Sequence, residues 1–278
     1  MKFVLYGLHR GESTAPDTLA RQAKLAEAAG FDALWVGDHI ALPRELGAAA
    51  ELPRHEALVA LTYLAAVTTM VKLGVGVLVL PQRQPVLLAK QLSSIDVLSK
   101  GRLTIGIGVG YLESELRATG ASFADRGARA DEYLAAMLNL WEPRVRPFAG
   151  RFVSFADVLE RPLPTQVPHP PIVIGGNSPA AHRRAVKSGN GWYGWQLDLQ
   201  ETADALAALR ETSNNYERSA ELGELEITIT PRAAIDHDTA RCYTDLGVHQ
   251  LAIQPSSTNA SAMDELITMA GDSLIGRL

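Results

Sequence analysis

Hydrophobic residues in this chain occur either in short continuous runs or at a spacing of three to four residues. Residues 73–80 form a continuous apolar run, as expected for a strand covered on both faces. Apolar residues then recur at helical spacing from Pro85 until Gly101, where the helix is expected to end. Residues 103–109 form a second buried run. This stretch predicts a β-α-β unit with parallel strands.

The same rhythm continues on both sides of this unit. Eight strand-helix pairs can be counted, and each connection is long enough to join parallel neighbours. The count predicts an α/β fold, a (β/α)8 TIM barrel that forms a single domain over residues 1–278. The expected strands are 2–8, 33–37, 73–80, 103–109, 172–174, 192–197, 226–230 and 250–254.

Local signals predict where several helices begin. The pairs Thr14 and Asp17, Asp198 and Glu201, and Ser261 and Asp264 have the spacing of a capping box. Prolines recur through residues 143–170, which predicts an irregular insertion after the fourth helix, with a small hairpin near Phe155. A linker between two domains is the alternative. Residues 40–56, rich in Ala, Gly and Pro, are expected to form a mobile loop.

Composition excludes several classes of partner. The chain has 278 residues, a net charge of −5 and one cysteine, Cys242, so neither an internal disulfide nor a cysteine-rich metal site is expected. Its one local basic cluster, at residues 183–187, is too small for a nucleic-acid surface. No apolar run approaches the roughly 20 residues that span a bilayer. We therefore expect a cytoplasmic protein without a nucleic-acid, membrane or metal partner.

Catalytic residues of TIM barrels lie at the carboxyl ends of the strands. This rule selects Asp38 and His39, residues 76–80, 109–114 and 175–178, Trp195, Arg232, and residues 254–256. A histidine side chain can exchange a proton during a reaction, which makes His39 a catalytic candidate, although a histidine after a strand also serves as a cap. Gly175, Gly176, Asn177 and Ser178 join a strand to a helix, which favours an anion site over a plain turn capped by Ser178.

Three motifs occur in a specific order. They are residues 31–39 (FDALWVGDH), residues 72–115 with their glycine-rich ends, and residues 171–178 (PIVIGGNS). Together they resemble the bacterial luciferase-like monooxygenase superfamily, and in particular its branch that depends on the deazaflavin coenzyme F420. The resemblance covers nearly the whole chain.

The resemblance implies positions for the cofactor. Its phosphate would bind at residues 175–178, and its ring would lie against Asp38 with His39 as the catalytic residue. A cis peptide bond is implied at Gly76-Val77, behind the ring. The glycine-rich end of the next strand, including Val109 and Gly110, would offer exposed backbone to the ring.

One position departs from the family's pattern. Sugar-phosphate dehydrogenases of this superfamily carry a glutamate where this chain has Tyr111, which argues against a sugar phosphate as substrate. The leading hypothesis is an F420-dependent oxidoreductase that transfers a hydride to or from a small organic molecule. The alternatives are an FMN-dependent monooxygenase and a non-catalytic flavin-binding protein. Residues 57–71 and 86–98 are expected to form a homodimer surface, unless both helices simply pack on the barrel.

Overall fold

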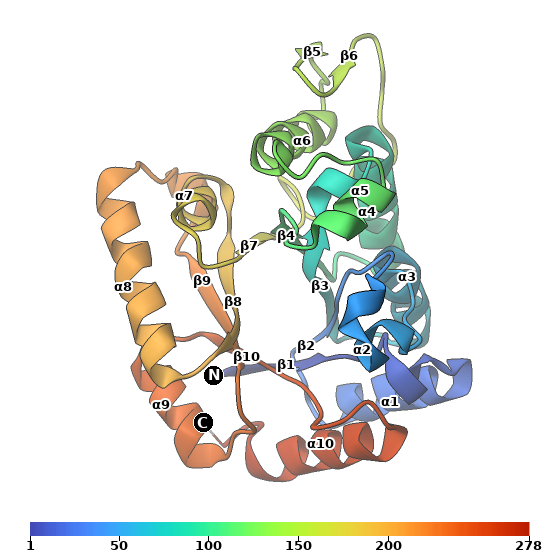
Figure 1. Ribbon diagram of the computed structural model, residues 1–278, viewed down its shortest axis with the longest axis vertical. Coiled ribbons are helices and arrows are strands. Elements are labelled where there is room, and N and C mark those ends of the chain that lie inside the picture. Colours follow the sequence, from blue (N-terminus) through green and yellow to red (C-terminus); the bar gives the residue numbers. More distant parts are fainter. Residues whose placement is uncertain (278) are drawn as a thin grey trace.

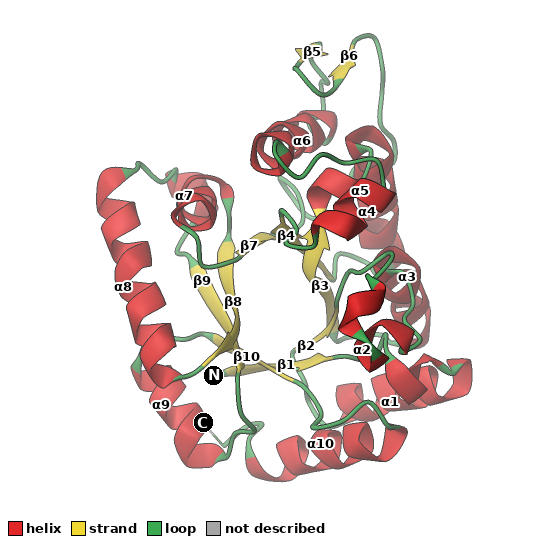
Figure 2. Cartoon of the chain, in the orientation of Figure 1, coloured by secondary structure: helices red, strands yellow, loops and turns green. Residues whose placement is uncertain are grey.

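Eight parallel strands close into a barrel surrounded by helices, as Figures 1 and 2 show for the computed structural model, which describes residues 1–277. Around the barrel the strands follow the order β1-β10-β9-β8-β7-β4-β3-β2. The prediction of a TIM barrel is therefore confirmed. The last residue of the expected domain, Leu278, lies outside the described residues.

The barrel strands are β1 (Lys2–Tyr6), β2 (Ala33–Val36), β3 (Lys72–Val79), β4 (Leu103–Gly108), β7 (Ile172–Gly175), β8 (Gly191–Leu197), β9 (Glu226–Pro231) and β10 (Gln250–Ile253). The helices that connect them or close the ring are α1 (Pro16–Ala28), α3 (Ala57–Val67), α4 (Pro85–Leu98), α6 (Arg126–Leu140), α7 (Pro179–Ser188), α8 (Leu199–Asn215), α9 (His237–Asp245) and α10 (Ala260–Ser273). None of the helices within residues 1–277 is long and apolar enough to cross a membrane.

Alternate residues of the strands point into the barrel and outward to the helices, so the barrel has two apolar layers. The outward layer packs on the helices and forms the larger core, with Leu5, Leu34 and Leu73 among its fully buried members. The inward residues form a separate, aromatic-rich cluster. Its members are Val4, Tyr6, Ala33, Trp35, Val77, Val173, Tyr193 and Ala252.

Two of the predicted helix caps were wrong. Pro16 is the first residue of α1 and Ala15 is its N-cap, so Thr14 lies one residue too early and instead donates its hydroxyl to the Gly11 carbonyl. Asn259, not Ser261, caps α10 by accepting the Ala262 N–H at 2.8 Å.

The third predicted cap is confirmed. Asp198 Oδ1 accepts the Glu201 N–H at 2.9 Å, and Glu201 Oε2 accepts the Asp198 N–H at 3.0 Å. This reciprocal pair begins α8.

The proline-rich insertion projects from the barrel between α6 and β7 (Figure 1) and contains a small antiparallel hairpin, β5 (Phe148–Ala149) and β6 (Ser154–Phe155). Two carboxylates tie the insertion to the helices. Glu132 of α6 accepts the N–H groups of residues 151–153, and Asp96 of α4 accepts those of residues 165 and 166. The insertion is thus anchored at two points along its length.

The segment expected to be a mobile loop contains local structure. It includes a short helix, α2 (Ala48–Glu51), and its end pairs with the turn after β1 through an antiparallel bridge between Arg54 and Arg10. The bridge holds the end of this segment at the mouth of the barrel.

Candidate functional site

His39 leaves the carboxyl end of β2 and is held by a buried carboxylate. Its Nδ1 lies 3.0 Å from Glu115 Oε2, and the His39 side chain is 26% exposed whereas that of Glu115 is 2% exposed. Glu115 belongs to the short helix α5 (Glu113–Ala118), 76 residues further along the chain. The contact assigns the Nδ1 proton to the hydrogen bond, which leaves Nε2 to exchange a proton with a ligand.

Glu115 also fixes the backbone that follows His39. Its Oε1 accepts the N–H groups of Ile40 at 2.6 Å and Ala41 at 3.3 Å. Burial opposes the charged form of Glu115, but the hydrogen bonds from His39, Ile40 and Ala41 outweigh it and lower its pKa. Sequence reasoning left Glu115 out of the chemistry, yet it determines the orientation of the imidazole.

Asp38 is held by other partners than His39 is. Its fully buried side chain accepts the Val79 N–H at 2.9 Å and Arg83 Nη2 at 2.6 Å. Burial raises the pKa of Asp38, and the charge of Arg83 opposes that rise. Both carboxylate oxygens are engaged, so Asp38 joins the ends of β2 and β3 and supports the site from behind.

Val77 fills the space left by glycines on β4 and β7. The Gly76-Val77 peptide bond is cis, and the pairing of β3 with β4 is irregular between Val75 and Leu78. A Cβ at Gly108 would lie 2.6 Å from Val77 Cγ2, and one at Gly175 would lie 2.9 Å from Val77 Cγ1. These glycines are therefore required by the packing of Val77.

Val109 and Gly110 follow directly after β4. Val109 is partly buried against the core, and Gly110 adopts a φ of +81°. The Gly110 carbonyl accepts Arg126 Nε at 3.1 Å. This turn leads from the strand into α5 and so delivers Glu115 to His39.

The turn at residues 175–178 lies between β7 and the first turn of α7. Ser178 caps α7 by accepting the Ala181 N–H at 3.2 Å, and the Gly176 N–H donates to the Tyr193 carbonyl at 3.3 Å. Among residues 1–277, the backbone N–H groups of Asn177 and Ser178 have no hydrogen-bond partner. The expected anion site therefore keeps two open amides at a helix N-terminus, but not that of Gly176.

The end of β1, which pairs with β2, and the turn after it hold three residues that sequence reasoning missed: Tyr6, His9 and Arg10. Tyr6 ends β1, and its ring centroid lies 5.0 Å from that of Trp195, which is 39% exposed. His9 accepts the Gly37 N–H at Nε2, 3.1 Å away, and burial lowers its pKa to about 3, so it is neutral. The carboxyl-end rule, extended to the first strand, would have included His9 and Arg10.

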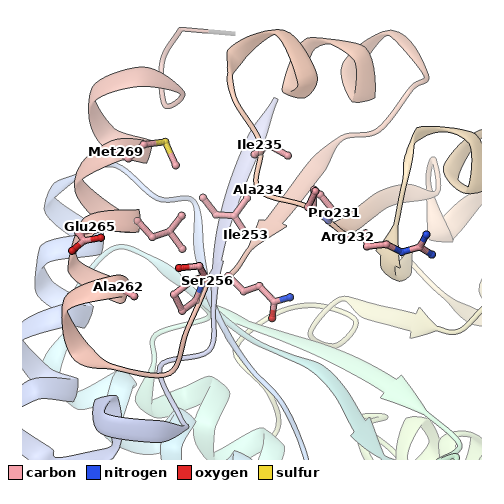
Figure 3. Close-up of a pocket in the computed structure, with 13 residues that line it drawn as sticks. Pro231, Arg232, Ala234, Ile235, Ile253, Ser256, Ala262, Glu265 and Met269 are labelled. Carbon is pink, nitrogen blue, oxygen red and sulfur yellow. The ribbon is translucent and has the colours of Figure 1, made fainter.

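A cavity of about 410 Å³ lies beside the mouth, between the loops after β9 and β10 and the inner face of α10 (Figure 3). Its walls are largely apolar, with Ile235, Ile253 and Met269 among them, while Figure 3 shows Arg232 pointing away from the other labelled residues. Arg232 instead pairs with Asp198 and Glu201. The cavity adjoins the mouth through Gln254 at the end of β10.

Comparisons with known proteins agree on one family. Residues 1–269 match the family model described as luciferase-like monooxygenase. The chain is 31% identical over 237 residues to an F420-dependent glucose-6-phosphate dehydrogenase of Kineococcus radiotolerans, covering 83% of this chain and 67% of that protein. It is 31% identical over 175 residues to the oxygenase component of a flavin-dependent trigonelline monooxygenase of Acinetobacter baylyi, covering 62% of this chain and 46% of that protein.

The solved structures support the fold. An F420-dependent secondary alcohol dehydrogenase in complex with an F420-acetone adduct superposes with a TM-score of 0.80 at 15% identity, covering 98% of both chains. Relatives of both cofactor classes are thus similar to this chain.

Proposed function

Because the chain belongs to the luciferase-like monooxygenase family, whose members similar to it are oxidoreductases and monooxygenases, we propose that it is an F420-dependent oxidoreductase. In this proposal a small organic substrate exchanges a hydride with the deazaflavin. The observation that carries the proposal is the His39–Glu115 pair at the carboxyl end of β2. It places a proton donor and acceptor where a TIM barrel performs its chemistry.

The proton accompanying the hydride is assigned to His39. A bound deazaflavin would supply or accept the hydride, and His39 Nε2 would give a proton to the substrate oxygen or remove one from it. Glu115 holds Nδ1 and so leaves Nε2 for this exchange. Asp38 acts indirectly by holding the end of β3 through Val79.

The residues at the end of β7 fit the phosphate of either cofactor. Gly176, Asn177 and Ser178 are all exposed, two of their amides are open, and Gly176 has no side chain to obstruct an anion. Asn177 adds an amide group that can donate a hydrogen bond. Val77, Val109 and Gly110 would line the ring.

The second candidate function is an FMN-dependent monooxygenase, favoured by the similarity to the trigonelline monooxygenase component. Fluorescence titration with F420 and with FMN, at matched ionic strength, separates the two. We expect tighter binding of F420 and no oxygen uptake with the reduced cofactor, because deazaflavin has carbon in place of the flavin N5 and reacts poorly with oxygen. A preference for FMN, with oxygen uptake when reduced flavin and substrate are supplied, would establish the monooxygenase.

We also propose a homodimer through α3 and α4. These adjacent helices expose large apolar side chains, among them Val59 at 64%, Leu87 at 57% and Leu98 at 62%. Sedimentation velocity should detect a dimer that Leu87→Glu dissociates. A monomeric wild-type protein at micromolar concentration would refute the dimer.

A further inference from the structure

Two arginines at the mouth of the barrel have unused hydrogen-bonding capacity. A guanidinium has five N–H donors. Arg10 uses one, from Nη2 to Gln254 Oε1 at 2.9 Å, and Arg54 uses one, from Nη2 to the Ala49 carbonyl at 2.9 Å. The Nε of each is buried without a hydrogen-bond partner, and within residues 1–277 neither arginine has a carboxylate within 4.0 Å.

Two other partly buried arginines, Arg102 and Arg218, are bonded differently. Arg102 donates five hydrogen bonds, and so does Arg218. Leaving donors unpaired in a partly buried place is costly, since the water they lose is not replaced. The contrast indicates that Arg10 and Arg54 keep their donors for a ligand.

The backbone brings the two arginines together. Arg10 and Arg54 are directly opposed in an antiparallel bridge, flanked by hydrogen bonds from Gly11 N to Pro53 O and from His55 N to His9 O, both 2.9 Å. Side chains of such a pair leave the same face and lie close together. Burial and the charge of Arg10 lower the pKa of Arg54. The charge of Glu115 acts in the opposite direction, but Glu115 is already bonded to His39.

The position of the pair separates it from the expected phosphate site. In the closed order of strands, β1 and β7 stand opposite each other. Arg10 follows β1, and residues 175–178 follow β7. A cofactor with its phosphate beside β7 would reach toward β3 and His39 and leave the β1 side for the substrate.

An aromatic wall adjoins the two charges. The Arg10 guanidinium carbon lies 5.6 Å from the centre of the Tyr6 ring, which packs on Trp195. The Tyr6 hydroxyl lies where a side chain at Gly37 would stand, two residues before His39, and it makes no hydrogen bond within the described chain. Burial raises the pKa of Tyr6 to about 12, so this hydroxyl stays a donor.

We propose that Arg10 and Arg54 bind the oxyanion of the substrate, which is a small organic acid whose carboxylate lies between the two guanidinium groups and whose apolar body lies on Tyr6 and Trp195. This assignment names the substrate class of the proposed oxidoreductase. Only the reaction of the bound acid rests on that proposed function, whereas its binding does not. Two guanidinium groups suit the planar, bidentate geometry of a carboxylate.

Binding of benzoate, measured by calorimetry on the purified protein without cofactor, tests the site apart from turnover. Benzamide is the neutral isostere, and inorganic phosphate represents the other common oxyanion. We expect benzoate to bind at least tenfold more tightly than benzamide, and Arg10→Gln combined with Arg54→Gln to remove that preference. Arg232→Gln is the matched control, because it removes an arginine at the same end of the barrel whose charge is already paired.

Each outcome decides the assignment. Arg10→Lys should keep part of the preference for benzoate, which guards against loss of fold in the double variant. Equal benzoate affinity in wild type and double variant, or no benzoate binding to wild type, would overturn the proposal. Phosphate binding that depends on the arginines, without benzoate binding, would reassign the substrate to phosphate esters. Competition of benzoate with F420, together with weaker F420 binding in the double variant, would show that the arginines bind the cofactor and not the substrate.

Discussion

At the amino-terminal end of the barrel, charged side chains bond to the backbone, whereas at the carboxyl end several keep unused capacity. Arg102, just before β4, donates to three carbonyls between the end of α3 and the start of β3, and Glu27 accepts the N–H groups of residues 69–71, just before β3. At the other end, Arg10 and Arg54 each donate once. A charge that is fully bonded stabilises the fold, and one that is not can still bind a ligand.

The carboxylates at the two ends of the barrel also differ in their hydrogen-bond partners. Glu27 accepts three backbone N–H groups and the Thr69 hydroxyl; burial raises its pKa, but these hydrogen bonds outweigh burial and the pKa is lowered. Glu115 bonds two N–H groups and a titratable imidazole. The same residue type therefore stabilises a loop at one end and orients a proton carrier at the other.

Replacing one arginine at each end of the barrel should show the largest difference between the two ends, measured as the free energy of unfolding. Arg102→Ala removes five hydrogen bonds, and we expect the free energy of unfolding to fall by roughly 2–4 kcal/mol. Arg10→Gln removes one, and we expect a loss below about 1 kcal/mol. Urea denaturation of both variants measures the difference. Similar losses would show that the two ends do not differ as described.

His39→Ala should act on chemistry and leave the fold intact. We expect turnover to fall about 100-fold, with cofactor affinity within a few-fold of wild type, because general acid-base catalysis contributes about this much to a rate. Steady-state kinetics and a cofactor titration measure both quantities. His237→Ala, at an exposed histidine that begins α9, is the control. Unchanged turnover in His39→Ala would return His39 to a structural role.

A new charge at the end of β7 should weaken cofactor binding, and this effect should be smaller than that of His39→Ala on turnover. Asn177→Asp places a negative charge beside the helix N-terminus, where it favours the helix but repels a phosphate. We expect the Kd of the cofactor to rise about tenfold, equivalent to about 1.4 kcal/mol. Asn259→Asp, at the N-terminus of α10, adds the same charge away from the site. If both variants bind equally well, the phosphate lies elsewhere.

The smallest effect concerns pH. Because the pKa of Glu115 is lowered in the folded state, its hydrogen bonds contribute their full stabilisation at pH values above the ordinary glutamate pKa of about 4.3. This stabilisation is lost as the pH falls through the lowered pKa. Glu115→Gln should therefore cost about 1 kcal/mol near pH 7, and this cost should shrink on acidification. Thermal melts of both proteins from pH 7 to pH 3 test this. A cost that stays constant with pH would contradict the assignment.

The alternation of strand and helix patterns along the chain was sufficient to predict the barrel, because each element is determined by nearby residues. Periodicity located the strands to within one or two residues, and Asp198 with Glu201 marked the start of α8. The failures at Thr14 and Ser261 were local too, since several polar residues near a helix start can serve as the cap and only the backbone conformation selects one.

Side-chain pairing across the barrel was not accessible in the same way. The Asp38–His39 pair was located correctly at the end of β2, but the two side chains bond to different partners, which lie 41 to 76 residues away along the chain. Arg54 lay in a segment without periodicity and gave no signal. Its importance follows from the bridge to Arg10, a contact that no pattern along the chain specifies.

The packing of Val77 against glycines on β4 and β7 limits how this protein can diverge. Residues 108 and 175 cannot gain even a methyl group while Val77 keeps both of its own, since each added Cβ would stand within 3 Å of it. A smaller residue at position 77 removes the obstruction first. Homologous chains should therefore show correlated residue sizes at these three positions, with a reduction at position 77 preceding any enlargement at the other two along a lineage.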